Sequence, residues 1–206
     1  MLIQSDPKSI EQKSMEIIED RLPGLAKLPQ GEREIVKRIV HTTGDVSIAE
    51  LVTIHPQAVE AGLKAIRNGR IIATDVNMLK VGINASCLGL FGVDVVCYIS
   101  DPDVAREAKE RGLTRAMVAM ERAAREAEGG IIAIGNAPTA LFTLCRMIQK
   151  GEAAPALVVG TPVGFVGACE SKQTLLDMTT PCITLPGTRG GSAIAVAAVN
   201  ALLALA

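Results

Sequence analysis

The chain repeats one pattern three times, as GGIIAIGNAPTALFTLCRMI (residues 129–148), APALVVGTPVGFVGACESKQTLL (154–176) and PCITLPGTRGGSAIAVAAVNALL (181–203). Each copy begins with a short aliphatic run, continues through a loop rich in Gly, Pro and Thr, and ends in a helix-forming stretch. A short apolar run bounded by Gly or Pro is typical of a strand that is buried on both faces of a parallel sheet. The three copies therefore predict an α/β sheet in which strands alternate with helices.

The residues before 129 continue this alternation. Gly44 is placed to end a helix as its C-terminal cap, and Asp101 with Pro102 is placed to begin one. Together the patterns predict a single α/β domain over residues 1–206, with a mostly parallel open sheet of about five strands and helices on both faces. The further strands are expected at 71–75 and 93–100, and the helices at 9–21, 31–40, 56–68, 77–82 and 114–128.

The loops that follow the three aliphatic runs are expected to form one binding site. Loops after parallel strands gather beyond the carboxyl ends of the strands, where ligands of α/β proteins bind. Each loop also leads into a helix N-terminus, where unpaired N–H groups and the helix dipole favour anions. We therefore predict a large, negatively charged ligand with contacts from Gly135, Asn136, Gly164 and Arg189. Lys172 is a further basic residue near these loops, although such a charge is often only a solvated surface side chain.

Composition limits the kinds of partner. The 206 residues carry 21 basic and 22 acidic side chains, a formal charge of −1, with no Trp, one Tyr and three Phe. Nucleic-acid binding is not expected, because it relies on a positive field and often on aromatic stacking. The polar N-terminus lacks a secretory signal, and the apolar segment 192–206 is shorter than the ~20 residues that span a bilayer. We therefore expect a cytoplasmic protein without a membrane partner, in which 192–206 is a buried or subunit-facing helix.

The five cysteines are predicted to be structural. They form no CxxC pair, and Cys97, Cys145 and Cys182 fall in predicted strands or on apolar helix faces. Such thiols act as small buried hydrophobic side chains in a reducing cytosol, although a redox or metal role stays open. The two histidines have no cysteine or carboxylate cluster beside them. We therefore expect no metal site and no cofactor.

His41 is the strongest candidate for catalysis. It lies at a helix end, where the dipole favours a protonated imidazole, and the hydroxyls of Thr42 and Thr43 are placed to orient the ring. Such an imidazole can act as a general acid near neutral pH, but it can equally be a capping or surface side chain. Arg38 precedes His41 by three residues and so shares its helix face. His55 is expected only to lead into the next helix.

The usual signatures of nucleophilic or nucleotide-dependent enzymes are missing from the sequence. It contains no GxSxG elbow and no Walker loop. Gly160, Gly164 and Gly167 are spaced wrongly for GxGxxG, and no acidic residue ends the following strand. A nicotinamide-dependent oxidoreductase is therefore only a weak alternative.

Seven segments together resemble the precorrin-8X methylmutase family of cobalamin biosynthesis, whose cobalt-using relatives act on cobalt-precorrin-8. The strings IGNAPTALF and PVGFVGACESK are long and uncommon, which makes the resemblance specific. It covers nearly the whole chain, through SIEQKSMEIIE (9–19), RIVHTTGD (38–45), DVNMLKVGI (75–83), YISDPDVAREAKERGLTRAMVAMERA (98–123), IGNAPTALF (134–142), VGTPVGFVGACESK (159–172) and TRGGSAIAVAAVNALL (188–203).

The resemblance implies a homodimeric α/β isomerase that moves a methyl group from C-11 to C-12 of the macrocycle, giving hydrogenobyrinate or, with cobalt, cobyrinate. His41 matches the family's catalytic histidine, a proton donor or acceptor, and the substrate contacts would fall on Ser14, Arg38, Asn84 and Arg115. A tetrapyrrole edged with carboxylates fits the predicted anion loops, and the reaction needs no nucleophile or redox cofactor. Two questions stay open: whether the protein is instead a non-catalytic corrinoid carrier, and whether the ligand carries cobalt.

Overall fold

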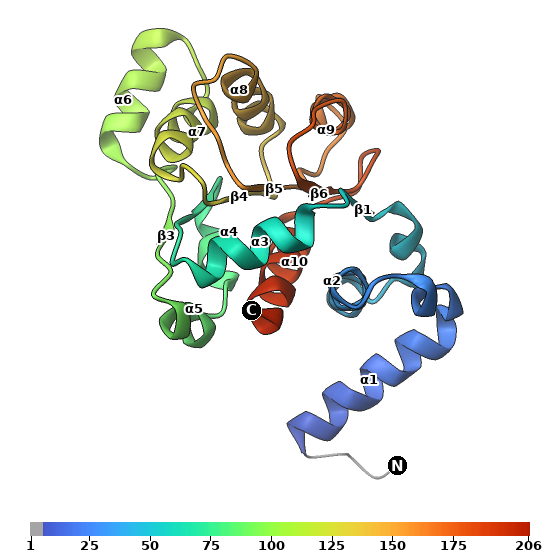
Figure 1. Cartoon of the computed structure of the whole chain (residues 1–206). Helices are drawn as coiled ribbons and strands as arrows, with labels where there is room; N and C mark the ends of the chain where they lie inside the picture. Colours follow the sequence, from blue (N-terminus) through green and yellow to red (C-terminus); the bar gives the residue numbers. More distant parts are fainter. Residues whose placement is uncertain (1–5) are drawn as a thin grey trace.

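The computed structural model describes residues 6–206, and a six-stranded sheet with the order β1-β6-β5-β4-β2-β3 forms its centre (Figure 1). Every neighbouring pair of strands is parallel except β1 and β6. This confirms the predicted mostly parallel open sheet. The strands are β1 (Thr53–Ile54), β2 (Ile72–Thr74), β3 (Val95–Val96), β4 (Ile131–Ile134), β5 (Leu157–Gly160) and β6 (Cys182–Thr184).

Helices cover both faces of the sheet, as predicted. α7, α8 and α9 lie on one face, α2, α3 and α10 lie on the other, and α1 packs outside α2 (Figure 1). The helices are α1 (Pro7–Arg21), α2 (Gln30–Thr43), α3 (Ala58–Arg67), α4 (Asn77–Gly82), α5 (Ala85–Phe91), α6 (Pro102–Arg111), α7 (Arg115–Glu126), α8 (Pro138–Gln149), α9 (Ala168–Leu176) and α10 (Ser192–Leu205), with short 3₁₀ helices at Pro23–Lys27 and Val46–Leu51.

The central strands are buried on both faces because their sequences are continuous aliphatic runs. In β4, Ile131 and Ala133 join the core with α2, α3 and α10, whereas Ile132 and Ile134 join the core with α7 and α8. All four side chains are 0% exposed. Successive side chains of a strand point to opposite faces, so one apolar run supplies both cores.

The edge strand β1 is an addition to the predicted sheet. Thr53 and Ile54 pair antiparallel with Thr184 and Ile183 of β6. Two residues are too few to show an alternating pattern, and the pairing depends on a strand more than a hundred residues away in sequence. The sequence therefore gave no local signal for β1.

The opposite edge strand, β3, is shorter than the predicted strand 93–100, because it pairs only with β2 and the chain then turns toward α6. Cys97 consequently lies outside the strand and is only half-buried, which corrects its predicted placement. Cys145 and Cys182 are buried as predicted, and burial raises the pKa of each thiol to about 11.

The C-terminal helix α10 is part of the core. It packs against α2, α3 and α4, and Ile194, Val199 and Leu202 are buried in it. The contact with α3 is close enough that a Cβ placed on Gly62 would lie 3.0 Å from Cδ1 of Leu202. The structure thus selects the buried alternative for this segment. No helix in the range 6–206 is long and apolar enough to cross a membrane.

Candidate active site

His41 lies in the last turn of α2, and its ring is held by the neighbouring helix α1. The helix ends at Gly44, as predicted, with a φ of 65° that glycine adopts readily. The Ser14 hydroxyl of α1 lies 2.9 Å from Nδ1 of His41. Thr43, expected beside the ring, instead donates its hydroxyl to the carbonyl of Ile39 at 3.0 Å. Ser14 is therefore the hydroxyl that orients the imidazole.

The contact with Ser14 leaves one ring nitrogen of His41 for chemistry. When Nδ1–H donates to the Ser14 oxygen, Nε2 carries the second proton of the imidazolium and is an acceptor once that proton has left. The imidazole is exposed, and it borders a small cavity of about 130 Å³. Nε2 can therefore exchange a proton with a molecule bound against this surface. The cavity is lined by Ser14, Ile17, Ile18, Arg21, Val40, His41, Gly44 and Val46.

Arg38 lies one helical turn before His41 and pairs with Glu11 of α1. The guanidinium Nη1 is 2.6 Å from Oε1 of Glu11, and this hydrogen bond holds the pKa of the Glu11 carboxyl below its usual range. Glu11 and Ser14 are three residues apart on α1, as Arg38 and His41 are on α2. Each residue of one pair therefore contacts one of the other, Glu11 with Arg38 and Ser14 with His41. The predicted common face of Arg38 and His41 is confirmed.

Arg189 reaches the end of α2 from the loop between β6 and α10. Its guanidinium lies 2.5 Å from Oδ2 of Asp45 and 3.1 Å from Oγ of Ser47, just after α2. Nζ of Lys172 donates to the Arg189 carbonyl at 2.6 Å. Lys172 is fully buried in α9, and this burial lowers its pKa. Lys172 is thus an internal anchor of the loop and no solvated surface charge.

The N–H groups of the first predicted anion loop are already bonded within the chain. The Asp75 carboxylate, which follows β2, accepts the N–H groups of Gly135 at 3.0 Å, Asn136 at 2.8 Å and Ala137 at 2.8 Å. Burial raises the pKa of Asp75, and the three hydrogen bonds oppose that rise. The expectation that these N–H groups are free for a ligand is therefore wrong. A contact from this loop would use the exposed Asn136 side chain instead.

The second loop turns at Gly164, whose φ of 144° favours glycine. Its N–H donates to the Thr188 carbonyl at 3.1 Å, which ties the second loop to the third. The next two side chains, Phe165 and Val166, are 93% and 89% exposed. Beside Gly164 the loop therefore presents an apolar surface.

Asn84 and Arg115 belong to other elements. Asn84 caps α5, because its Oδ1 accepts the N–H groups of Ser86 at 3.0 Å and Cys87 at 3.2 Å. Arg115 is the exposed first residue of α7. In the part of the chain that the structure describes, no hydrogen bond or ion pair joins either side chain to His41.

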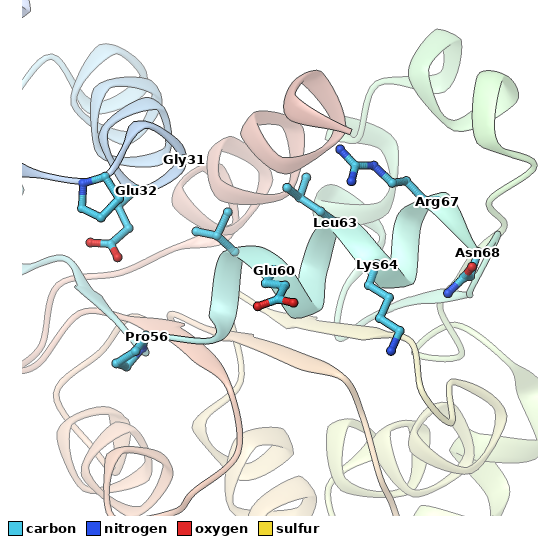
Figure 2. Close-up of a pocket in the computed structure, with 10 residues that line it drawn as sticks. Gly31, Glu32, Pro56, Glu60, Leu63, Lys64, Arg67 and Asn68 are labelled. Atoms are coloured by element: carbon cyan, nitrogen blue, oxygen red, sulfur yellow. The ribbon is translucent and has the colours of Figure 1, made fainter.

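A larger cavity, of about 630 Å³, follows the outer side of α3 (Figure 2). Glu60, Lys64 and Arg67 of α3 and Glu32 of α2 lie along it. All its lining residues fall within 29–32 and 56–68, so it contains none of the residues predicted to bind or react. Volume alone would therefore point to a different part of the molecule than the residues predicted from the sequence.

His55 leads into α3, as predicted. Its Nδ1 accepts the N–H of Gln57 at 3.2 Å, which fixes the turn before the helix. Among residues 6–206, no group of three or more His, Cys, Asp or Glu side chains is placed to hold a metal ion.

Three acidic residues at these sites are not predicted from the sequence, namely Glu11, Asp45 and Asp75. Asp75 had the clearest signal, since it is a charged residue that closes an otherwise apolar strand. Glu11 lies one helical turn from Ser14, but its partner Arg38 is 27 residues away. Only the packing of α1 on α2 reveals that pair.

Nearly all of these elements lie within the region of the chain that matches known proteins. A sequence model of the family described as precorrin-8X methylmutase matches residues 9–205. The chain belongs to the precorrin-8X methylmutase family. The resemblance predicted from the sequence is thereby confirmed.

Relatives within the precorrin-8X methylmutase family align over almost their full length. The cobalt-precorrin-8 methylmutase of Priestia megaterium is 46% identical over 200 residues, which cover 97% of this chain and 88% of that protein. The cobalt-precorrin-8 methylmutase of Leptospira interrogans is 41% identical over 206 residues, which cover 96% and 93%. The crystal structure of the precorrin-8X methylmutase from Thermus thermophilus has a TM-score of 0.88 at 39% identity and covers 96% of this chain and 95% of that one.

Proposed function

We propose that the chain is an isomerase of cobalamin biosynthesis that moves a methyl group from C-11 to C-12 of precorrin-8X or cobalt-precorrin-8. The products are hydrogenobyrinate and cobyrinate respectively. The observation that carries this proposal is the family match over residues 9–205, which includes the paired faces of α1 and α2. The relatives named above are methylmutases of both kinds.

His41 is the proton donor and acceptor of the proposed reaction. The methyl shift is intramolecular, so the protein has to supply a proton and orientation, with no nucleophile or electron carrier. In the imidazolium form, Nδ1–H donates to the Ser14 oxygen, and Nε2–H gives its proton to a ring nitrogen or adjacent carbon as the methyl group migrates. The neutral imidazole that remains takes a proton back at Nε2 afterwards. Ser14 acts here by positioning the imidazole as well as by contacting the substrate.

We assign the carboxylates of the macrocycle to cationic and polar side chains on several elements, of which Arg38 shares the helix of His41. Arg38 is partly exposed, so a substrate carboxylate can replace Glu11 as its partner. Arg115 and Arg189 provide further positive charge, and Asn84, Asn136 and Gly164 complete the proposed contacts. Phe165 and Val166 beside Gly164 offer an apolar surface to the ring face.

A second copy of the chain completes the binding site. The cavity at His41 holds about 130 Å³, whereas sites for small-molecule ligands typically enclose ~300–1,000 Å³. Met78, Val81 and Leu90, on α4 and α5, are 72%, 79% and 79% exposed, which suits a homodimer contact. Sedimentation at two concentrations tests the dimer.

The cytoplasm is the proposed location, since all five cysteines are free thiols.

Purified protein incubated with metal-free and with cobalt-containing substrate tests the activity. The visible absorption spectrum follows the change in conjugation when the methyl group leaves C-11. We expect conversion of at least one substrate, and the ratio of the two kcat/KM values identifies the natural one. Absence of conversion with both substrates, with the protein folded by circular dichroism, would refute the proposed reaction.

Arg189→Ala is expected to raise KM about tenfold while kcat changes little. The substitution removes one charge-assisted contact to a substrate carboxylate, worth about 1.5 kcal/mol. The free energy of unfolding should change by less than about 1 kcal/mol, because the Arg189–Asp45 pair has side chains 47% and 36% exposed. Arg106→Ala, which removes the exposed pair with Asp103 on α6, is the matched control and should leave KM unchanged. Equal KM values for both variants would remove Arg189 from the site.

A further inference from the structure

Asp75 lies where the connections of the sheet change direction. From β2 the chain passes to β3 on one side, and it later returns to β4 on the other side of β2 (Figure 1). In open α/β sheets the crevice at such a switch point is the usual place for a ligand. The residue that follows β2 is Asp75, and the residues that follow β4 are Gly135, Asn136 and Ala137.

The carboxylate of Asp75 occupies the position at which an anionic ligand would bind. Its two oxygens accept all three N–H groups of residues 135–137, at 2.8–3.0 Å, and the residue is only 2% exposed. We call these three N–H groups the N–H nest. Residues 135–137 directly precede α8, so the N–H nest and the dipole of α8 both favour a negative charge at the nest.

The loop that contains the N–H nest also packs closely against α10, on the side away from Asp75. A Cβ on Gly135 would lie 2.5 Å from Cα and 2.8 Å from N of Ser192, the first residue of α10. The loop is thus held between Asp75 and α10, with the exposed Asn136 side chain between buried Gly135 and Ala137. A shift of the nest would therefore move Asn136.

We propose that Asp75 is a positioning and specificity-determining residue, whose carboxylate fills the N–H nest in place of a ligand anion and so fixes the orientation of Asn136. Asp75 is too buried to touch substrate, and it acts through the loop. A phosphate or carboxylate of a ligand is excluded from the switch point, which directs the substrate's carboxylates to the arginines instead. The effect on Asn136 rests on the proposed function, whereas the filling of the nest does not.

Asp75→Ala combined with added formate tests this inference. The substitution leaves the N–H nest empty, and formate supplies a planar carboxylate of suitable size. We expect formate, compared with chloride at equal ionic strength, to raise the melting temperature of the variant and leave that of the wild-type protein unchanged. We also expect kcat/KM of the variant to fall about 10²-fold, the loss typical of a ~1 Å displacement in a site, and to recover at least in part with formate.

Two further variants keep the test decisive. Asp94→Ala removes an exposed aspartate before β3 and should neither lose activity nor respond to formate. Asp75→Asn keeps the shape of the side chain, so it serves if the alanine variant does not fold, and its kcat/KM should fall because an amide N–H₂ faces the nest. A folded Asp75→Ala protein with wild-type kcat/KM and no formate response, or a folded Asp75→Asn protein with wild-type kcat/KM, would overturn the inference. Formate-specific stabilisation of the alanine variant in a protein without methylmutase activity would uphold the filled nest and reject the proposed function.

Discussion

Replacing His41 with alanine is expected to lower kcat about 10²- to 10⁴-fold, the range that general acid–base catalysis contributes. KM should change much less, because the carboxylates of the substrate are bound by other side chains. The imidazole is exposed and its hydrogen bond to Ser14 is at the surface, so the variant should fold normally. Stopped-flow measurement of the absorption change, with circular dichroism as a check on folding, gives both quantities.

His55→Ala is the matched control for this substitution. His55 is the chain's other histidine, and its Nδ1 only accepts the Gln57 N–H before α3. We expect it to leave kcat unchanged. Ser14→Ala should lower kcat by an intermediate factor, about tenfold, because the imidazole remains but loses its orienting hydroxyl. Wild-type turnover by the folded His41→Ala protein would exclude His41 from the chemistry.

Gly135→Ala is expected to lower the free energy of unfolding by about 3 kcal/mol, at the upper end of what overpacking costs. The added Cβ would meet backbone atoms of Ser192 at 2.5 Å and 2.8 Å, and backbone cannot rotate out of the way as a side chain can. This expectation reverses the sequence-based one, in which Gly135 served mainly to bind a ligand. Chemical denaturation measures the change.

Gly89→Ala provides the opposite result for comparison. Gly89 lies in the exposed part of α5, and a Cβ there would meet nothing within 4 Å. Alanine is a better helix former than glycine by about 1 kcal/mol, so this variant should be slightly more stable than the wild-type protein. If Gly135→Ala proved as stable as Gly89→Ala, the close packing of the loop against α10 would be refuted.

The strands and helices that the sequence predicted are those with a strong local signal. β4 and β5 are continuous aliphatic runs bounded by Gly or Pro, so their burial on both faces is readable without any knowledge of their partners. β1 has no such signal, because Thr53 and Ile54 become a strand only by pairing with β6. The ends of β3 were wrong for a related reason, since an edge strand continues only as far as its one neighbour.

The site shows the same division between local and distant information. Arg38 and His41 were placed on one face by their spacing within a single helix. The Ser14 and Glu11 contacts needed the packing of α1 on α2. The prediction of free N–H groups at Gly135 is wrong because the sequence shows which N–H groups begin a helix but not which carboxylate accepts them. That carboxylate, Asp75, is 60 residues away.

Counting product molecules per protein chain with substrate in large excess distinguishes a methylmutase from a corrinoid carrier. The measurement uses the change in visible absorption, calibrated with purified product. A methylmutase with His41 as its proton donor should form many product molecules per chain, and the His41→Ala protein should form them at least about 10² times more slowly. A wild-type protein that stops after one product molecule per chain, or that only binds added product, would be a carrier and not a methylmutase.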